Sequence, residues 1–205
     1  MVYAFNHLTV SQYQAVHGIM QVEKDVLEQD LHILSFLTGE SKDYFEEMPL
    51  KRLQVLRQRI AWVRQNKFTA SRKRYLFING KPYKAISEAR LLNTAQYTDI
   101  KTFLTRGTAI EQMHNILACI FIPLSWKGFR YSGKKHPDVA KAMLNVKISK
   151  VYPTVFFYSK ALKNWIKAIQ ASGLKQVQRI NKQALTQMRK GNLGSIGDGK
   201  SPLMN

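Results

Sequence analysis

The sequence predicts a mainly α-helical protein: a helical bundle with one small β-hairpin at about residues 74–86 and a flexible C-terminal tail. Three observations support this fold class. Apolar residues recur at helical spacing along most of the chain, Asn79-Gly80 interrupts a short β-prone run, and residues 191–205 are rich in Gly and Ser. The 205 residues, 45% of them hydrophobic, suffice for one large domain or two small ones.

Residues 1–68 are expected to form an N-terminal helical unit. Thr9 and Gln12 make a capping-box pattern that starts a helix near residue 10. Gly18 is expected to loosen or divide this helix, and Gly39 to end it. A short turn capped by Ser41 follows.

A basic helix is then predicted from Pro49, which suits a first helical position, to about Asn66. This basic helix follows an acidic one, so the two can pair electrostatically. Its inward stripe is expected to contain Leu50, Leu53, Leu56, Ile60 and Val63.

Residues 69–190 are expected to form a second domain that combines the hairpin with basic helices. Asn79-Gly80 predicts a two-residue turn, because both residues tolerate positive φ. The helix ending at Pro123 is apolar all round and is therefore expected to be central and buried. A loop rich in bases and aromatics follows at 124–136. The helices of this domain are predicted at 94–104, 108–122, 137–145, 153–171 and 174–190.

Charge is segregated along the chain. Residues 1–50 hold two bases and eight acids (2 − 8 = −6), whereas residues 51–205 hold 30 bases and five acids (30 − 5 = +25). This asymmetry indicates contact with a polyanion or an acidic protein surface. Solubility is the alternative reading, although it does not require charge on one side only.

No catalytic pattern is present, and we expect no enzyme, metal site or cofactor. The single cysteine, Cys119, rules out an internal disulfide and lies in an apolar segment that suppresses its thiolate. The five histidines lack metal-ligand spacing, and the glycines beside lysines lie outside a phosphate-loop frame. We expect no signal peptide and no membrane anchor, since the longest apolar run, 116–124, is too short to span a bilayer.

Basic segments interleaved with aromatics are the candidate binding site for nucleic acid or an acidic partner. Lys and Arg side chains that follow a phosphate backbone, with aromatic side chains that stack on nucleobases, are typical of single-stranded nucleic-acid binding. Such binding is non-specific and salt-dependent. The alternative is that the aromatics are core residues and the lysines lie on solvated faces. The candidates are Arg72, Lys73, Arg74, Lys81, Lys84, Trp126, Lys127, Arg130, Tyr131, Lys134, Lys135, Lys160, Lys163, Lys167, Lys175, Arg179, Lys182, Arg189 and Lys190.

Several stretches resemble proteins of tailed phages. The segments LTVSQYQAVHGIM and LHILSFLTGESKDYFEEMPLKRLQVL are similar to N-terminal parts of phage tail and assembly proteins, including tail-assembly chaperones. The segments YLFINGKPYKAI, LNTAQYTDIKTF and MHNILACIFIP resemble proteins of Bacteroidota phages, including crAss-like phages. The resemblance covers roughly residues 8–160.

The resemblance implies a non-enzymatic virion protein near the portal or tail, or a cargo protein packaged with the genome. It would be made in the host cytoplasm, reside in the tail or capsid interior, self-associate in multiple copies, and contact portal, tail or ring proteins and DNA. The alternatives are a non-specific nucleic-acid-binding protein and a tail-assembly chaperone absent from the mature virion.

Overall fold

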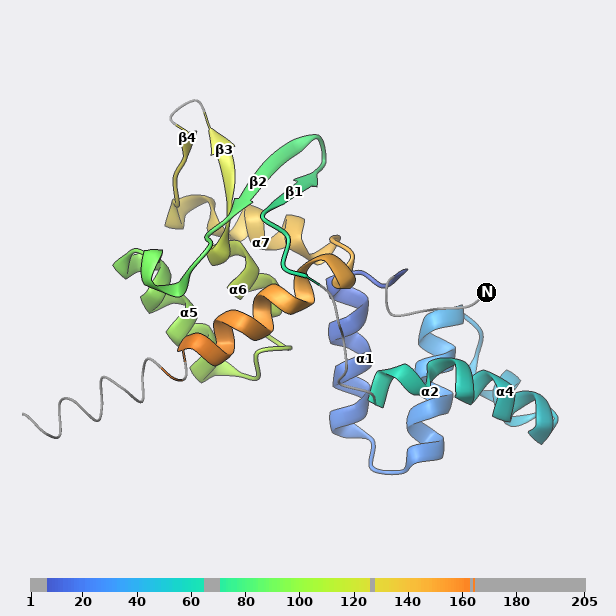
Figure 1. The fold of residues 1–205 in the computed structure, drawn as a ribbon. Helices are drawn as coiled ribbons and strands as arrows, with labels where there is room; N and C mark the ends of the chain where they lie inside the picture. The colour runs from blue at the N-terminus through green and yellow to red at the C-terminus, as the bar shows by residue number, and fades with distance from the viewer. Residues whose placement is uncertain (1–6, 65–70, 126–127, 163, 165–205) are drawn as a thin grey trace, which may run out of the picture. The chain divides into compact units, whose positions relative to one another are not determined.

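The computed structural model describes residues 7–64, 71–125, 128–162 and 164. The chain divides into two compact units, Met1–Lys160 and Ala161–Asn205, and the following description concerns the first. Helices dominate it, and they accompany one small antiparallel sheet (Figure 1). The mainly α-helical fold class is therefore confirmed.

Four helices form the N-terminal part: α1 (Val10–Val22), α2 (Val26–Thr38), α3 (Lys42–Glu46) and α4 (Leu50–Ile60), which the 3-10 turn Ala61–Arg64 extends. The predicted capping box is present, because Thr9 Oγ1 accepts from the Gln12 N–H and Gln12 Oε1 accepts from the Thr9 N–H. Gly39 ends α2 with a left-handed φ of 81°, and Ser41 caps α3.

The break between α1 and α2 lies at residues 23–25, not at Gly18. Asp25 decides it: its carboxylate accepts from the N–H groups of Leu27 and Glu28 at 2.8 and 2.9 Å, as an N-cap does. Pro49 is likewise the N-cap of α4 rather than its first residue, and Leu50 is exposed rather than inward.

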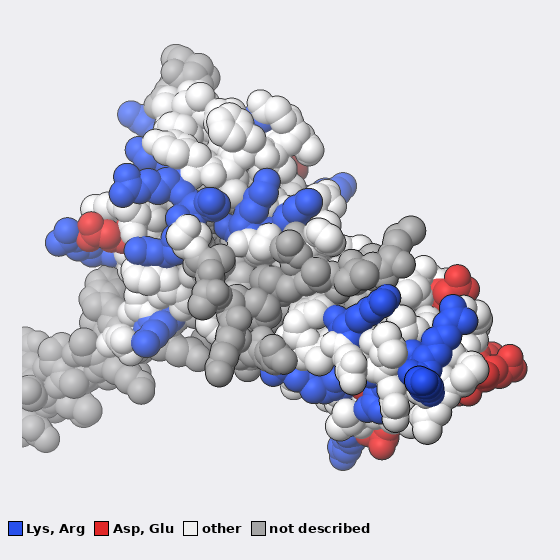
Figure 2. Space-filling model, turned by 45° about the vertical axis from the view of Figure 1, so that its right-hand side comes forward, with Lys and Arg blue, Asp and Glu red and all other residues white. Residues whose placement is uncertain are grey.

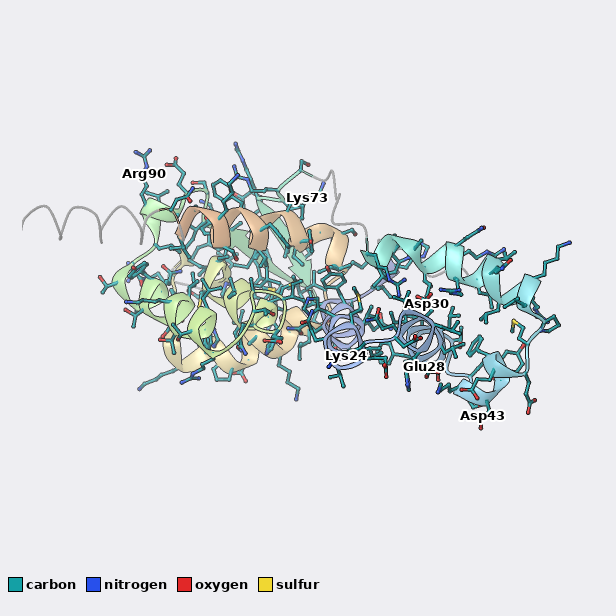
Figure 3. All side chains as sticks on the ribbon, turned by 90° about the horizontal axis from the view of Figure 1, so that it is seen from below. Lys24, Glu28, Asp30, Asp43, Lys73 and Arg90 are labelled. Atoms are coloured by element: carbon teal, nitrogen blue, oxygen red, sulfur yellow. The ribbon has the colours of Figure 1, made fainter. Side chains whose placement is uncertain are left out.

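Asp30 on α2 joins the acidic and basic helices. Its nearly buried carboxylate is paired with Arg57 Nε at 2.6 Å and with Arg64 Nη1 at 2.7 Å, and it lies between α2 and α4 in Figure 3. The expected electrostatic pairing of the two helices is thus present. Around it the helices bury Leu31, Leu34, Phe45, Leu53, Ile60 and Val63.

The predicted hairpin is confirmed as β1 (Tyr75–Ile78) and β2 (Lys81–Ala85), with Asn79 and Gly80 at φ 50° and 73°. It belongs to a larger sheet than expected, in the order β1-β2-β3-β4, with β3 at Phe121–Ser125 and β4 at Gly128–Phe129. All pairings are antiparallel.

The prediction that residues 121 and 122 end a helix is therefore wrong, as is the reading of 124–136 as one loop. Helix α6 (Met113–Ile120) stops at Phe121, where the chain turns into β3 and pairs with β2 through Phe121, Ile122 and Pro123. Beyond Pro123 the strand pairs with β4 instead. Pro123 thus lies where β3 changes partners, a position that tolerates a missing N–H better than the middle of a ladder.

Further helices lie below the two hairpins in the view of Figure 1: α5 (Thr94–Arg106), α6 and α7 (His136–Leu144), followed by helical residues 148–162. Short 3-10 turns occur at Ala89–Leu91 and Gly133–Lys135. Helix α6 is central and buried as predicted, and it contacts α5, α7 and α1. The last helix starts at Ile148, so Pro153 lies inside it rather than at its start.

The segment before α1 is tied to the segment before the last helix. Val10 N–H donates to Val146 O at 2.9 Å, Ile148 N–H donates to Leu8 O at 2.8 Å, and Thr9 forms an isolated antiparallel bridge with Lys147. These contacts hold residues 8–10 next to residues 146–148, although the two segments are far apart in the sequence.

Some predictions concern residues outside the described ranges. The domain boundary at 68/69 falls within residues 65–70, and the helix at 174–190 and the tail at 191–205 fall within the C-terminal unit. These remain predictions.

Candidate nucleic-acid interface

Strand β1 separates its side chains into two faces. Leu76 and Ile78 are buried, whereas Tyr75 and Phe77 are 51% and 75% exposed. Side chains alternate across a strand, so Tyr75 and Phe77 share one side of the sheet. Two large aromatics on an exposed strand are unusual, because burial would stabilise each by about 1.5–3 kcal/mol.

Neighbouring strands add to this side. Lys84 on β2 is the register partner of Tyr75, and the Lys84 Nζ lies 5.7 Å from the Phe129 ring centroid. The Phe129 ring on β4 in turn lies 6.5 Å from that of Tyr75, tilted by 57°. We call Tyr75, Phe77, Lys84 and Phe129 the open sheet face.

A groove of about 910 Å³ is lined by Tyr75, Lys84 and Phe129 of the open sheet face, and Phe77 lies next to it on the same side of β1. Arg74, Lys84 and Arg130 supply three bases to it, and the rings of Tyr75, Phe129 and Tyr131 supply apolar surface. Among the described residues that line the groove, the one carboxylate is that of Glu88, which lies 2.5 Å from Arg90 Nε. The groove therefore combines positive charge with aromatic surface.

The predicted basic run 72–74 lines a second, smaller pocket of about 310 Å³ next to the groove. Arg72 is held in place there: its guanidinium lies 3.7 Å from the Phe157 ring centroid, and its Nη1 donates to Ser87 O. Lys73 and Arg74 are exposed.

Tyr131 is anchored at the base of the β4 segment. Its hydroxyl donates to Asp99 Oδ2 at 2.6 Å and lies 3.8 Å from Cys119 Sγ. Burial raises the pKa of Tyr131, and it raises the pKa of the Cys119 thiol to about 12. Cys119 is thus a protonated core residue, and Tyr131 offers a ring edge rather than a free hydroxyl.

The other predicted binding residues are dispersed. Lys81 and Lys135, with Arg130, line a pocket of about 790 Å³ between the sheet and α7. Lys134 is exposed on the turn Gly133–Lys135, and Lys160 is exposed near the end of the last helix. The remaining candidates lie outside the described residues: Trp126, Lys127, Lys163, Lys167, Lys175, Arg179, Lys182, Arg189 and Lys190.

Sequence reasoning found the bases of the groove but missed Tyr75 and Phe77. The signal was present as aromatics at alternate positions of a predicted strand, but alternation does not say which face is covered. In Figure 2, Lys and Arg are spread over the part that carries the sheet, and most Asp and Glu on this side lie over the N-terminal helices.

Comparison with known proteins adds no relative. No protein-family model matches the chain, and neither the curated proteins nor the solved structures contain a significant match. Within the described ranges, no helix is long and apolar enough to cross a membrane. The same residues contain no group of three or more His, Cys, Asp or Glu that is arranged to hold a metal ion.

Proposed function

We propose that this protein is a non-enzymatic, single-stranded nucleic-acid-binding protein without sequence specificity, which uses the open sheet face and its groove. The observation that carries the proposal is the exposure of Tyr75 and Phe77 on one side of the sheet, where Tyr75 lines the groove together with Arg74, Lys84 and Arg130. Stacking of a base on an aromatic ring is worth about 1–3 kcal/mol, so a bound strand stabilises rings that water does not.

A single strand fits this surface better than a duplex does. Bases of a single strand are free to lie against aromatic rings, whereas those of a duplex are already stacked. Several neutral polar side chains of the groove are already engaged: Asn93 and Gln96 cap the start of α5, and the Tyr131 hydroxyl donates to Asp99. The rings and cations are therefore its main contacts for a strand, and neither kind of contact distinguishes one nucleobase from another. The other Lys and Arg residues of the protein add long-range attraction for phosphates.

The biological setting that we propose is the virion of a tailed phage, with the protein in multiple copies near the portal and tail or packaged as cargo. The phage-like segments and the segregated charge support it. Mass spectrometry of purified particles tests it: detection of the chain is expected, and absence from mature particles leaves the assembly-chaperone alternative.

Binding is tested by fluorescence anisotropy with an oligonucleotide of about 10 nucleotides, a length that one such groove covers. The double variant Y75A/F77A is expected to weaken binding at least about tenfold, because two stacking contacts are lost. F36A is the matched control, since Phe36 is also exposed (44%) but lies on α2.

Two results would contradict the proposal. One is equal affinity of wild type and Y75A/F77A for the single strand. The other is a preference for duplex over single strand of the same sequence, which would indicate a phosphate-only contact.

A further inference from the structure

We propose that the small pocket behind the basic run is a phosphate site. It is lined by Arg72, Lys73, Arg74, Thr154 and Tyr158, together with residues 85–87. The inference rests on the proposed function, because it assigns to this pocket one phosphate group of the bound strand.

The three bases are available to an anion. Among the described residues, none of Arg72, Lys73 and Arg74 takes part in an ion pair. Glu88, whose charge acts on Tyr158 in the pocket wall, is paired with Arg90. Arg72 is already fixed by the Phe157 ring and Ser87 O, so ordering its guanidinium for a ligand costs little entropy.

Thr154 is the observation that points to a ligand. The residue is 1% exposed, and its Oγ1 has no hydrogen-bond partner among the residues that the structure describes. An unpaired buried hydroxyl is destabilising, so one that lines a cationic pocket calls for an explanation. Thr has two accessible χ1 rotamers in a helix, one of which can turn the hydroxyl to donate to an anion.

Tyr158 does not compete for that role. Its hydroxyl donates to Ile86 O and so fixes the pocket wall to the end of the hairpin. The donors left for a ligand are therefore the guanidinium N–H groups of Arg72 and Arg74, the Lys73 ammonium and the Thr154 hydroxyl. Several charge-assisted donors around one small volume suit the non-bridging oxygens of a phosphate group.

The phosphate pocket adjoins the groove. Arg74 and residues 85–87 line both, so a strand lying on the open sheet face passes the mouth of the pocket. The phosphate can come from the strand's interior, as a phosphodiester with two non-bridging oxygens, or from its end, as a monoester with three non-bridging oxygens and more negative charge.

The first test uses inorganic phosphate and the variant T154V, which keeps the shape of Thr154 and removes its hydroxyl. We expect phosphate to raise the Tm of wild type above its value in chloride of equal ionic strength. T154V is expected to melt higher than wild type without phosphate, because no unpaired hydroxyl remains, and to lose most of the phosphate-dependent rise. R74Q is a second variant expected to lose that rise, with K101Q on α5 as the charge-matched control.

The second test compares oligonucleotides of about 10 nucleotides that carry a 5′-phosphate, a 3′-phosphate or hydroxyls at both ends. Tighter binding of one phosphorylated strand, abolished by T154V, identifies the terminal source. Equal weakening of all three strands by T154V identifies an internal phosphate.

The inference is overturned if phosphate shifts the Tm no more than chloride does and T154V binds every strand like wild type. Failure of the proposed function is distinguishable from this result. If only the proposed function fails, phosphate still raises the Tm, while Y75A/F77A binds strands as wild type does.

Discussion

Asp30 shows how a single residue links the two charge classes of this chain. Its carboxylate is 3% exposed and faces two arginines, each about one-third exposed. A buried carboxylate of this kind is tolerated only because both partners are present. Position 30 therefore decides whether α2 and the basic stretch 57–64 stay together.

We expect D30N to lower the free energy of unfolding by about 1–3 kcal/mol, because it removes the common partner of Arg57 and Arg64 while these remain partly solvated. Urea unfolding followed by circular dichroism measures the change. E28Q is the control, since Glu28 pairs with Lys42 at the surface and its loss should matter much less. Equal losses for D30N and E28Q would contradict the role assigned to Asp30.

The hairpin β1–β2 is the element on which the binding surface depends. Its turn uses Gly80 at φ 73°, a left-handed conformation in which a side chain is strained. The hairpin also sets the register that places Lys84 opposite Tyr75.

We therefore expect G80A to destabilise the protein by about 1 kcal/mol, because an alanine is strained at this positive φ. It should also weaken single-strand binding, because a distorted turn disturbs the pairing of β1 with β2. Thermal unfolding and anisotropy measure the two effects. The same substitution at Gly18 in α1 is the control: its added Cβ meets no atom, and Ala favours a helix interior, so G18A should stabilise by about 0.5–1 kcal/mol. A G80A variant as stable as G18A would argue against the strained turn.

The helices and strands also show which parts of the fold can be predicted from the sequence. Signals contained in a few adjacent residues were read correctly: the Thr9 capping box, Gly39 and the Asn79-Gly80 turn. The N-cap at Asp25 is equally local but was not predicted.

Strand β3 could not be predicted from the sequence, for another reason. An apolar run such as 116–122 suits a buried helix or a strand, and only pairing of residues 121–123 with the distant residues 83–85 decides between them. The open sheet face was not predicted for the same reason. Which side of β1 is exposed depends on the elements that pack against it, and these are distant in the sequence. The basic residues of the groove were found because charge is visible without the fold.

At the scale of the whole molecule, net charge acts beyond the contact surface. A charge of +19 attracts any polyanion, but this attraction is screened over about 8 Å at physiological salt. Contacts in the groove are screened much less. The two contributions therefore separate by salt dependence.

We expect R52Q/R59Q on α4, away from the sheet, to weaken single-strand and duplex binding alike by a few-fold at low salt, and not at all near 0.5 M salt. Y75A/F77A should instead lose affinity for single strands at both salt concentrations, because stacking is not electrostatic. Anisotropy titrations over a salt series measure this. A loss from Y75A/F77A that disappears at high salt would mean that charge alone carries binding.

The tie between residues 8–10 and 146–148 has a consequence for how the chain is made. The bridge from Thr9 to Lys147 spans 147 − 9 = 138 positions, so the first helix reaches its final partner only when most of the chain has left the ribosome. Until then the part of α1 that contacts the later helices, including Tyr13 beside Tyr152, is unprotected in the nascent polypeptide. Contacts between residues far apart in the sequence form slowly. The newly synthesised protein therefore exposes apolar surface for a time, during which a chaperone can bind it.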